Sequence, residues 1–294
     1  MRIYGERSQR TIARPAEVCG TGFLTGAAVR LRFVPAPPSC GVVFVRTDLR
    51  PHVEIPARVT RVTGTSRRTT LGQEPARIGL VEHVLAALAG LRIDNCYVEL
   101  DAPEPPGLDG SARAFVDALI DAGVVRQPER RPIWCVNEPI VLLSNGATLA
   151  IHPTDHGTLT LSYFLDYGLG APIARQVHTQ SLTPAGFTCD LAPCRTFILE
   201  SEAEELRRQG IGSRTTVSDL LVFGPRGPID NRLRFANEPA RHKVLDLVGD
   251  LSLLGADLCG HVVAYRSGHP LNVELVQSLH QRIAAVTAPL RLAA

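Results

Sequence analysis

The chain has 294 residues, of which 45% are hydrophobic and 20% are charged, as in an ordinary globular protein with room for two domains. A formal net charge of only +2 argues against a protein that coats nucleic acid, and a core of this size needs neither disulfides nor metal to fold. One detail is unusual: Lys243 is the only lysine among 31 basic residues.

The start of the chain and the cysteines indicate a cytoplasmic protein. Residues 1–15 are polar and lack the apolar segment of a signal peptide, and no apolar run approaches the roughly 18 residues of a membrane span. The seven cysteines form no CxxC pair, and their number is odd. We therefore expect reduced, mostly buried thiols and no zinc site made of cysteines.

In the first half, apolar periodicity and turn residues predict alternating strands and helices. The predicted elements are a strand over 42–46, a helix over 80–91, a strand over 93–100, and a helix capped by Ser111 and ended by Gly123. Residues 124–132, VVRQPERRP, are mostly polar, basic and proline-bearing, and this composition predicts a linker.

The second half continues the mixture of strands and helices. The expected elements are strands over 133–136, 147–152, 159–164 and 261–265, and helices over 200–208, 239–254 and 270–285. The pattern is α+β rather than regular βαβ. The glycines of GTGFLTG do not have the spacing of a dinucleotide fingerprint. We expect two α+β domains, residues 1–127 and 128–294.

The strongest local pattern is RHKVLDLVGD, residues 241–250. On a helix, His242 and Asp246 are four residues apart and share one face, and Asp250 stays near that face. A histidine and a carboxylate at this spacing suit one divalent metal ion, because a helical turn brings their donor atoms within a few ångströms. A solvated helix face with an ion pair fits the same spacing, so both interpretations stay open at this point.

A second pattern is the pair Glu82-His83, which interrupts an otherwise apolar predicted helix near its start. A solvated pair at a helix N-terminus is the simple interpretation. However, a catalytic zinc ion has three protein ligands and one position for water, so His83 would fit as the third ligand. Glu82, adjacent but not a ligand, would then be placed to accept a proton from that water.

A third pattern is YRSGHP, residues 265–270, in which Gly268 makes a turn and Pro270 suits the first position of a helix. His269 is thus predicted at a helix N-terminus, where the helix dipole disfavours its protonated form. A nearby carboxylate, for which Asp250 is the candidate, would keep the ring available as an acid near neutral pH. A simple helix cap is the alternative.

Together these segments resemble the UDP-3-O-acyl-N-acetylglucosamine deacetylase family, the zinc amidases of lipid A synthesis. The resemblance runs nearly end to end and is carried by VEHVLAALAGLRIDNCYVEL, PEPPGLDGSARAF, CRTF, RFANEPARHKVLDLVGDL and AYRSGH. The combination of E-H-x-x-A-A-L, H-K-x-x-D-x-x-x-D and S-G-H, in this order, is highly specific.

The resemblance implies two α+β domains, each with a sheet layered on helices, and an active site between them. It implies a Zn²⁺ ion held by His83, His242 and Asp246. By the same resemblance, Glu82 would be the general base. His269 would be the general acid or the electrostatic partner of the oxyanion, with Asp250 orienting it.

The resemblance also implies roles around the reacting group. Thr196, in CRTF, would hydrogen-bond the oxyanion, and Phe197 would help to wall the site. Lys243 would contact the substrate diphosphate or the region of the metal. Arg266 stands where the family often has a lysine near the diphosphate. The segment from residue 198 to about 231 would be the inserted βαβ element that lines the acyl-chain passage.

Several positions depart from the family pattern. The G-x-G-L-H-x-G segment reads GTGFLTG here, with Leu24 in the histidine position, and His152 stands at a lysine position. The inserted element reads GIGSRTTVSD, which is more polar and less glycine-rich than usual. These changes leave the implied zinc ligands intact and concern contacts with the substrate and its acyl chain.

The sequence therefore predicts a cytoplasmic, monomeric zinc hydrolase that removes the N-acetyl group of UDP-3-O-acyl-N-acetylglucosamine. Its partner is a small UDP-linked acylated amino sugar, with no nucleic acid and no stable membrane insertion. The alternatives are a zinc amidase acting on another acylated or nucleotide-linked amino sugar, and a non-catalytic ligand-binding homologue. Because Arg266 replaces a lysine whereas Lys243 is retained, we expect that a compact ammonium group is needed at residue 243.

Overall fold

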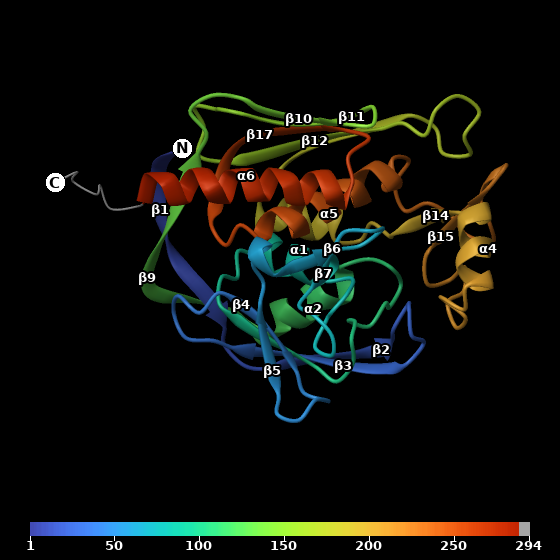
Figure 1. Ribbon diagram of the computed structural model, residues 1–294, viewed down its shortest axis with the longest axis horizontal. Coiled ribbons are helices and arrows are strands. Elements are labelled where there is room, and N and C mark those ends of the chain that lie inside the picture. Colours follow the sequence, from blue (N-terminus) through green and yellow to red (C-terminus); the bar gives the residue numbers. More distant parts are fainter. Residues whose placement is uncertain (288–294) are drawn as a thin grey trace.

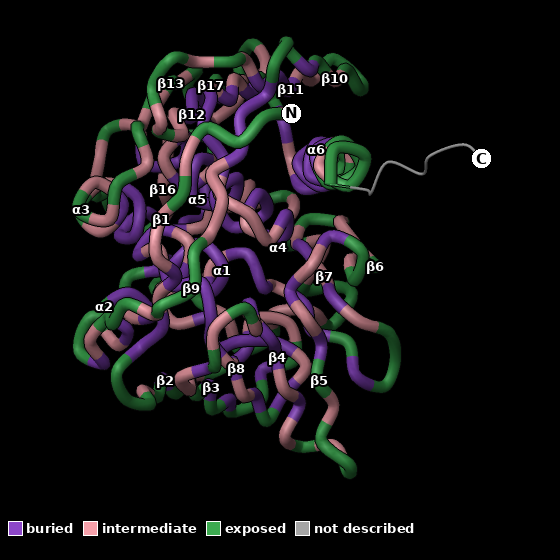
Figure 2. Tube along the Cα trace, turned by 90° about the vertical axis from the view of Figure 1, so that its left-hand side faces the viewer, coloured by how far each residue is buried: buried purple, intermediate pink, exposed green. Residues whose placement is uncertain are grey.

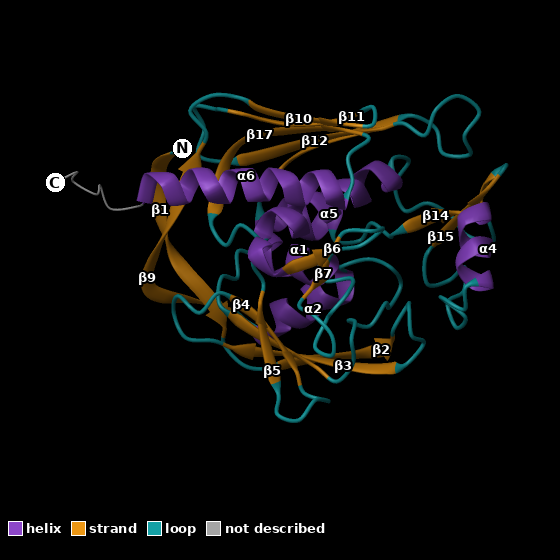
Figure 3. Ribbon diagram, viewed as in Figure 1, coloured by secondary structure: helices purple, strands orange, loops and turns teal. Residues whose placement is uncertain are grey.

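The computed structural model describes residues 1–287. Two main sheets lie on opposite sides of a group of helices, as Figures 1 and 3 show. The helices between the sheets are α1 (Glu82–Gly90), α2 (Arg113–Ala122), α5 (Glu238–Ser252) and α6 (His269–Thr287). This arrangement confirms the predicted α+β class.

The first sheet is built from the first half of the chain in the order β2-β3-β8-β4-β5, and its only parallel pair is β4 with β8. Its strands are β2 (Ala16–Thr21), β3 (Ala28–Pro35), β4 (Val42–Arg46), β5 (Val53–Pro56) and β8 (Cys96–Leu100). Alternate residues of β3 are buried, which is the pattern of a strand with one face on the core. On that face Phe33 meets Phe115 of α2 edge to face, with ring centroids 6.3 Å apart.

The second sheet has seven strands. Strand β17 pairs with β9 through its first residues and with β11 and β12 further on; β10 extends the sheet beyond β11, and β13 beyond β12. The strands are β1 (Arg2–Ile12), β9 (Val124–Cys135), β10 (Ile140–Ser144), β11 (Ala147–His152), β12 (Leu159–Leu165), β13 (Gln176–Ser181) and β17 (Asp257–Tyr265).

Residues 124–132 form the first part of strand β9 rather than a loop-like linker. This strand pairs antiparallel with β1 from Val124, opposite Ile12, to Cys135, opposite Arg2. The polar side chains and prolines are tolerated because this long ribbon is largely exposed, while β1 supplies the backbone partner. Figure 1 shows the ribbon reaching from one main sheet to the other. The boundary between residues 127 and 128 falls inside β9, and the division into two domains stays a prediction.

A smaller unit projects at one side of the molecule in Figure 1. It consists of β14 (Phe197–Leu199), α4 (Glu200–Arg208) and β15 (Leu221–Gly224), and because β14 and β15 are parallel it is a βαβ unit. The remaining short elements are a 3₁₀ turn (Val59–Arg61), β6 (Val62–Gly64), β7 (Thr70–Leu71), α3 (Pro184–Gly186), a π-helical turn (Phe187–Leu191) and β16 (Gly227–Pro228).

The predicted helices over 80–91, 200–208, 239–254 and 270–285 correspond to α1, α4, α5 and α6, with ends that agree within two residues. The N-cap residue of α2 is Ala112 and not the predicted Ser111, and no side chain caps this helix, although the hydroxyl of Ser111 accepts a hydrogen bond from the Arg113 amide at 3.3 Å. Figure 2 shows that the buried residues concentrate in α1, α5 and the strands that face them. The core therefore surrounds the contact between these two helices.

No helix within residues 1–287 combines the length and the apolar character needed to cross a membrane.

Candidate metal centre

Helix α1 comes from the first half of the chain and α5 from the second, and the two pack at very short range. A Cβ atom at Gly249 of α5 would lie 2.2 Å from the backbone carbonyl oxygen of Glu82, so only glycine permits this approach. Because this contact lies beside His83 and Asp246, it helps to set how close the donor groups of the two helices come.

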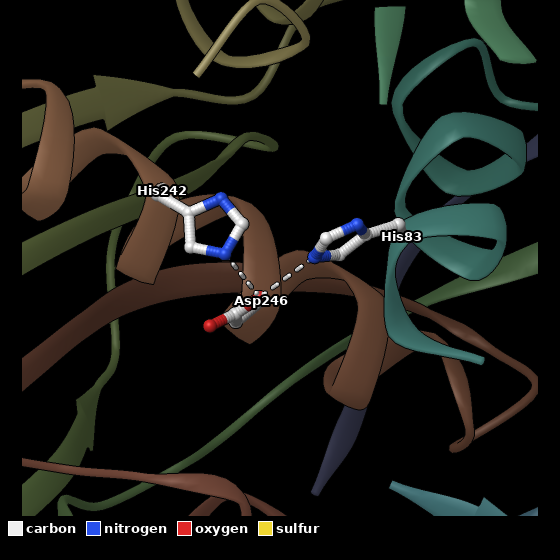
Figure 4. Close-up of side chains that lie close together, drawn as sticks. All are labelled: His83, His242 and Asp246. Carbon is white, nitrogen blue, oxygen red and sulfur yellow. Dashed lines mark ion pairs between the residues drawn. The ribbon is translucent and has the colours of Figure 1, made fainter. Parts of the chain in front are cut away.

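His83 of α1 and His242 and Asp246 of α5 meet at this contact (Figure 4). One donor atom from each lies within 4.8 Å of the other two. Asp246 Oδ1 is 3.2 Å from Nε2 of His242 and 3.6 Å from Nε2 of His83. Tetrahedral coordination with bonds of about 2.0–2.2 Å separates neighbouring donors by roughly 3.3–3.6 Å. The spacing and the donor types therefore fit one metal ion of the zinc class.

Neighbouring groups fix the orientation of these donors. The carbonyl oxygen of Cys194 lies 3.1 Å from Nδ1 of His242, so a proton on Nδ1 would be donated there and the Nε2 lone pair would face Asp246. Burial lowers the pKa of His242, although Asp246 opposes this, and so favours the neutral ring that a metal requires.

Lys243 holds the other oxygen of Asp246. Its Nζ donates to Oδ2 at 2.7 Å, which leaves Oδ1 for the two histidines. Burial acts to raise the pKa of Asp246, but His242 and Lys243 outweigh it and hold that pKa well below its usual value. Burial likewise acts to lower the pKa of Lys243, but Asp246 and Tyr163 raise it above the ordinary value. The pair is therefore a carboxylate and an ammonium.

Glu82 lies at the start of α1, with only 2% of its surface exposed. Its Oε2 accepts a hydrogen bond from the Thr69 amide at 3.1 Å. Burial raises the pKa of Glu82, and the partly opposing effect of His269 and His83 does not cancel this. A carboxyl group with a raised pKa, next to a metal-binding group, has the properties of a general base.

His269 begins α6 and forms a buried network with Asp250 of α5. Its Nδ1 lies 2.8 Å from Asp250 Oδ2, and that oxygen also accepts a hydrogen bond from Asn272 at 2.9 Å. Thr69 donates to Asp250 Oδ1 at 2.6 Å. Burial acts to lower the pKa of His269, but Asp250 outweighs it and raises that pKa to about 9. The raised pKa favours the protonated ring of His269, which Asp250 holds in place.

Thr69 and Asn272 are parts of the site that the motifs did not indicate. Thr69 connects Glu82 with Asp250 because its amide donates to the first and its hydroxyl to the second. It lies 181 residues from Asp250 in the chain and belongs to no recognised motif, so only the fold brings them together. Ser267, two residues before His269, donates a hydrogen bond to the side-chain oxygen of Asn272 at 2.6 Å. This contact orients the side-chain NH₂ group of Asn272 toward Asp250.

A cavity of about 560 Å³ opens over the metal-binding group. Thr196 and Phe197 both line it; the hydroxyl of Thr196 makes no hydrogen bond to any part of the chain that the structure describes, and the Phe197 ring centroid lies 6.1 Å from that of His242. The apolar part of the wall is formed largely by the βαβ unit and its flanks, through Ile198, Leu206, Ile211, Leu220 and Val222.

Arg266 and His152 are not among the residues that line this cavity. Arg266 donates through Nε to the carbonyl oxygen of Asp166 at 2.7 Å, and His152 pairs with His261 between β11 and β17. Leu24 does line the cavity, and its amide donates to the buried carboxylate of Glu104 at 2.9 Å. Of the three positions, only Leu24 thus lies where a ligand over the metal-binding group would touch it.

The sequence of this chain is similar to those of known proteins. The family model described as LpxC, UDP-3-O-acyl N-acetylglycosamine deacetylase, matches residues 9–281. The UDP-3-O-acyl-N-acetylglucosamine deacetylase of Trichormus variabilis is 39% identical over 276 residues, which cover 92% of this chain and 98% of that protein. The deacetylase of the same name from Chlamydia caviae is 38% identical over 92% of this chain and 96% of its own length. The deacetylase of the same name from Myxococcus xanthus is 36% identical over 92% of this chain and 86% of its own length.

Proposed function

This chain belongs to the UDP-3-O-acyl-N-acetylglucosamine deacetylase family, and we propose that it hydrolyses the N-acetyl group of UDP-3-O-acyl-N-acetylglucosamine. The products are the free amine and acetate, and the reaction is the committed step of lipid A biosynthesis. The observation that carries the proposal is the buried group of His83, His242 and Asp246 beside Glu82, at one end of a large cavity.

The cofactor in this proposal is Zn²⁺, held by His83, His242 and Asp246. Two imidazole nitrogens and one carboxylate oxygen are donors that zinc prefers, and three protein ligands leave a position for water. When bound, the ion supplies Lewis-acid polarisation of the amide carbonyl and of water.

Glu82 takes the proton of the attacking water. Its raised pKa gives the carboxylate the basicity for this step, and the hydrogen bond from the Thr69 amide fixes one of its oxygens. Substrate binding that excludes water from the cavity strengthens each of these interactions.

His269 and Thr196 act on the other side of the reacting amide. His269 is protonated at neutral pH because Asp250 raises its pKa to about 9, so it has a proton to deliver to the departing amine. The free hydroxyl of Thr196 donates to the carbonyl oxygen as negative charge develops there. Removing one such donor typically costs about 2.7–4 kcal/mol of transition-state stabilisation.

The cavity accounts for the rest of the substrate. The acyl chain lies along the apolar wall that the βαβ unit supplies, with Phe197 between this wall and His242. Lys243 lines the same cavity and provides a cation for the diphosphate side, in addition to its contact with Asp246. Arg266 remains a candidate for the diphosphate, at a position outside the cavity lining.

We propose a cytoplasmic, monomeric enzyme. All seven cysteines are free thiols, as expected in a reducing compartment. One chain supplies the metal ligands, the base and the acid, so the chemistry requires no second copy. The partner is the small-molecule substrate.

The direct test is a comparison of substrates with the zinc-loaded protein. We expect one acetate released per free amine formed from UDP-3-O-acyl-N-acetylglucosamine, and a much lower kcat/KM for UDP-N-acetylglucosamine, which lacks the acyl chain. Preference for the non-acylated sugar would favour the alternative of an amidase for another amino sugar, for which Leu24 in the cavity wall is the specific observation. Bound zinc without turnover of any of these amides would indicate a non-catalytic homologue.

We expect the Lys243→Arg substitution to lower kcat/KM at least tenfold, which corresponds to about 1.4 kcal/mol. The Lys243 side chain is only 18% exposed and its Nζ meets a single oxygen of Asp246, so a planar guanidinium is too broad for the same contact. Steady-state kinetics together with zinc content measure the effect. Arg241→Lys, on the same helix but bonded to Asp190, is the matched control. Wild-type kinetics for Lys243→Arg would show that the single lysine is accidental.

A further inference from the structure

A second cavity, of about 120 Å³, lies beyond the metal-binding group, towards the C-terminal ends of α1 and α5. Leu85 and Leu88 of α1 and Val248 and Leu251 of α5 form part of its wall. These positions lie within two helical turns of His83 and Asp246, on the same pair of helices. Both halves of the chain line it, and no residue is shared with the cavity over the metal-binding group.

Arginines outnumber carboxylates around this cavity. The charged lining residues are Arg7, Arg58, Arg92, Arg131, Asp94 and Asp257. The two aspartates are already paired: Arg7 donates to both, and Arg131 lies 2.7 Å from Asp257. Within residues 1–287, the side chains of Arg58 and Arg92 have neither an ion pair nor a hydrogen bond. The cavity wall therefore carries two positive charges without a counterion.

The backbone around Arg58 is shaped to hold its guanidinium. A Cβ atom at Gly255 would lie 1.1 Å from Nη1 and one at Gly41 would lie 3.1 Å from Nη2, so the group sits between two glycines. Both glycines have positive φ, of 66° and 76°. Burial, together with the nearby charge of Arg131, lowers the pKa of Arg58. A half-buried cation beside another cation is unfavourable, and an anion would offset this.

The remaining wall limits the chemistry of a ligand. Besides the four leucine and valine side chains from α1 and α5, it contains Leu159, Leu182 and Ile133. At roughly 30 Å³ of liquid volume per water molecule, the cavity holds about four waters or one anion of a few non-hydrogen atoms. Guanidinium groups bind planar and tetrahedral oxyanions through paired N–H donors.

We propose that this second cavity is a binding site for a small oxyanion, held by Arg58 and Arg92, with room for a short apolar substituent against the leucine side. The ligand would contact both α1 and α5, and so stabilise the helix contact on which the metal-binding group depends. Because such coupling is reciprocal, a ligand that tightens zinc binding is itself bound more tightly by the zinc-loaded protein.

The test is a titration of the zinc-loaded protein with butanoate, inorganic phosphate and the neutral analogue butanamide, in a buffer without other oxyanions. Amide resonances of Gly41 and Gly255 report on the site locally, which separates it from binding at the zinc ion. We expect saturable shifts with an oxyanion and none with butanamide. Tighter binding of butanoate would assign a carboxylate with an apolar tail, and tighter binding of phosphate a phosphate group.

Arg58→Gln is expected to weaken this binding at least tenfold. Arg113→Gln, which removes an exposed arginine of α2 that pairs with Asp117, should change it less than twofold. In the absence of oxyanion, the Arg58→Gln variant should have a melting temperature no lower than that of the wild type, since the substitution removes an unpaired cation. When the oxyanion is added, the melting temperature of the wild type should rise and that of the variant should not. If Arg58→Gln is misfolded, Arg58→Lys serves instead, with weakened binding expected. No saturable shift, equal binding by the Arg58 variant, or equal shifts with butanamide would each overturn the proposal.

Discussion

Replacing His242 by alanine is expected to abolish both zinc binding and deacetylation. The substitution leaves only His83 and Asp246, and two ligands hold zinc poorly. Because a metal ion contributes several kcal/mol of charge stabilisation in such reactions, we expect turnover to fall by at least about 10³-fold. Metal analysis of the purified protein and acetate release measure the two effects. A metal-free His242→Ala protein that still turned over substrate would refute the proposed mechanism.

Glu82→Gln is the matched comparison, because it changes the proposed base and leaves the three metal ligands in place. The side-chain oxygen of glutamine still accepts the hydrogen bond from the Thr69 amide, so the local structure around residue 82 is kept. We expect wild-type zinc content and a loss of about 10²–10⁴-fold in kcat, the usual contribution of a general base. If Glu82→Gln lost zinc together with activity, its role would be structural rather than catalytic.

The second large effect concerns the protonation of His269. Its ring is faced by the carboxylates of Asp250 and Asp246 on α5 and of Glu82 on α1, and Asp250 outweighs burial to raise its pKa to about 9. A raised pKa means that the charged pair stabilises the fold fully below the ordinary value of 6.5, and that this contribution is lost as pH rises through about 9. In the metal-free protein, we expect the free energy of unfolding to fall by about 3 kcal/mol across this range.

Urea unfolding with a chelator present, at several pH values between 6 and 10 (roughly the range that brackets this titration), measures the effect. The control is Asp250→Asn, which keeps an oxygen for the Thr69 hydroxyl but removes the charge that raises the pKa of His269. We expect this variant to be less stable near neutral pH and nearly independent of pH above it. A wild-type curve that is flat between pH 6.5 and 9 would show that His269 is not held as a cation.

Much of the fold could be predicted because its signals are local. The apolar spacing of α1, α5 and α6 acts within single helices, so the sequence predicts their ends within two residues. The pattern of His242 and Asp246 is local in the same sense, because helical spacing alone puts both on one face. The meeting of His83 with this pair is not local, and its prediction depended on resemblance to a family.

The features that could not be predicted depend on partners far away in the chain. Residues 124–132 have the composition of a loop, yet they form a strand because their backbone pairs with β1. Thr69 carries no motif, and its place beside Asp250 follows only from packing of the two halves. The same holds for Arg58, whose environment is set by Gly41 and Gly255 from different parts of the fold.

The division of the metal-binding group between α1 and α5 also has a consequence for biosynthesis. His83 leaves the ribosome about 160 residues before His242, which at roughly 5–20 residues per second is a delay of about 8–30 s. For roughly the first third of this time β1 also lacks its partner β9, whose last residue, Cys135, is made well before His242. Until His242 is made, a nascent chain contains only one of the three proposed ligands, and we therefore expect zinc to bind only after α5 has been made and has packed against α1.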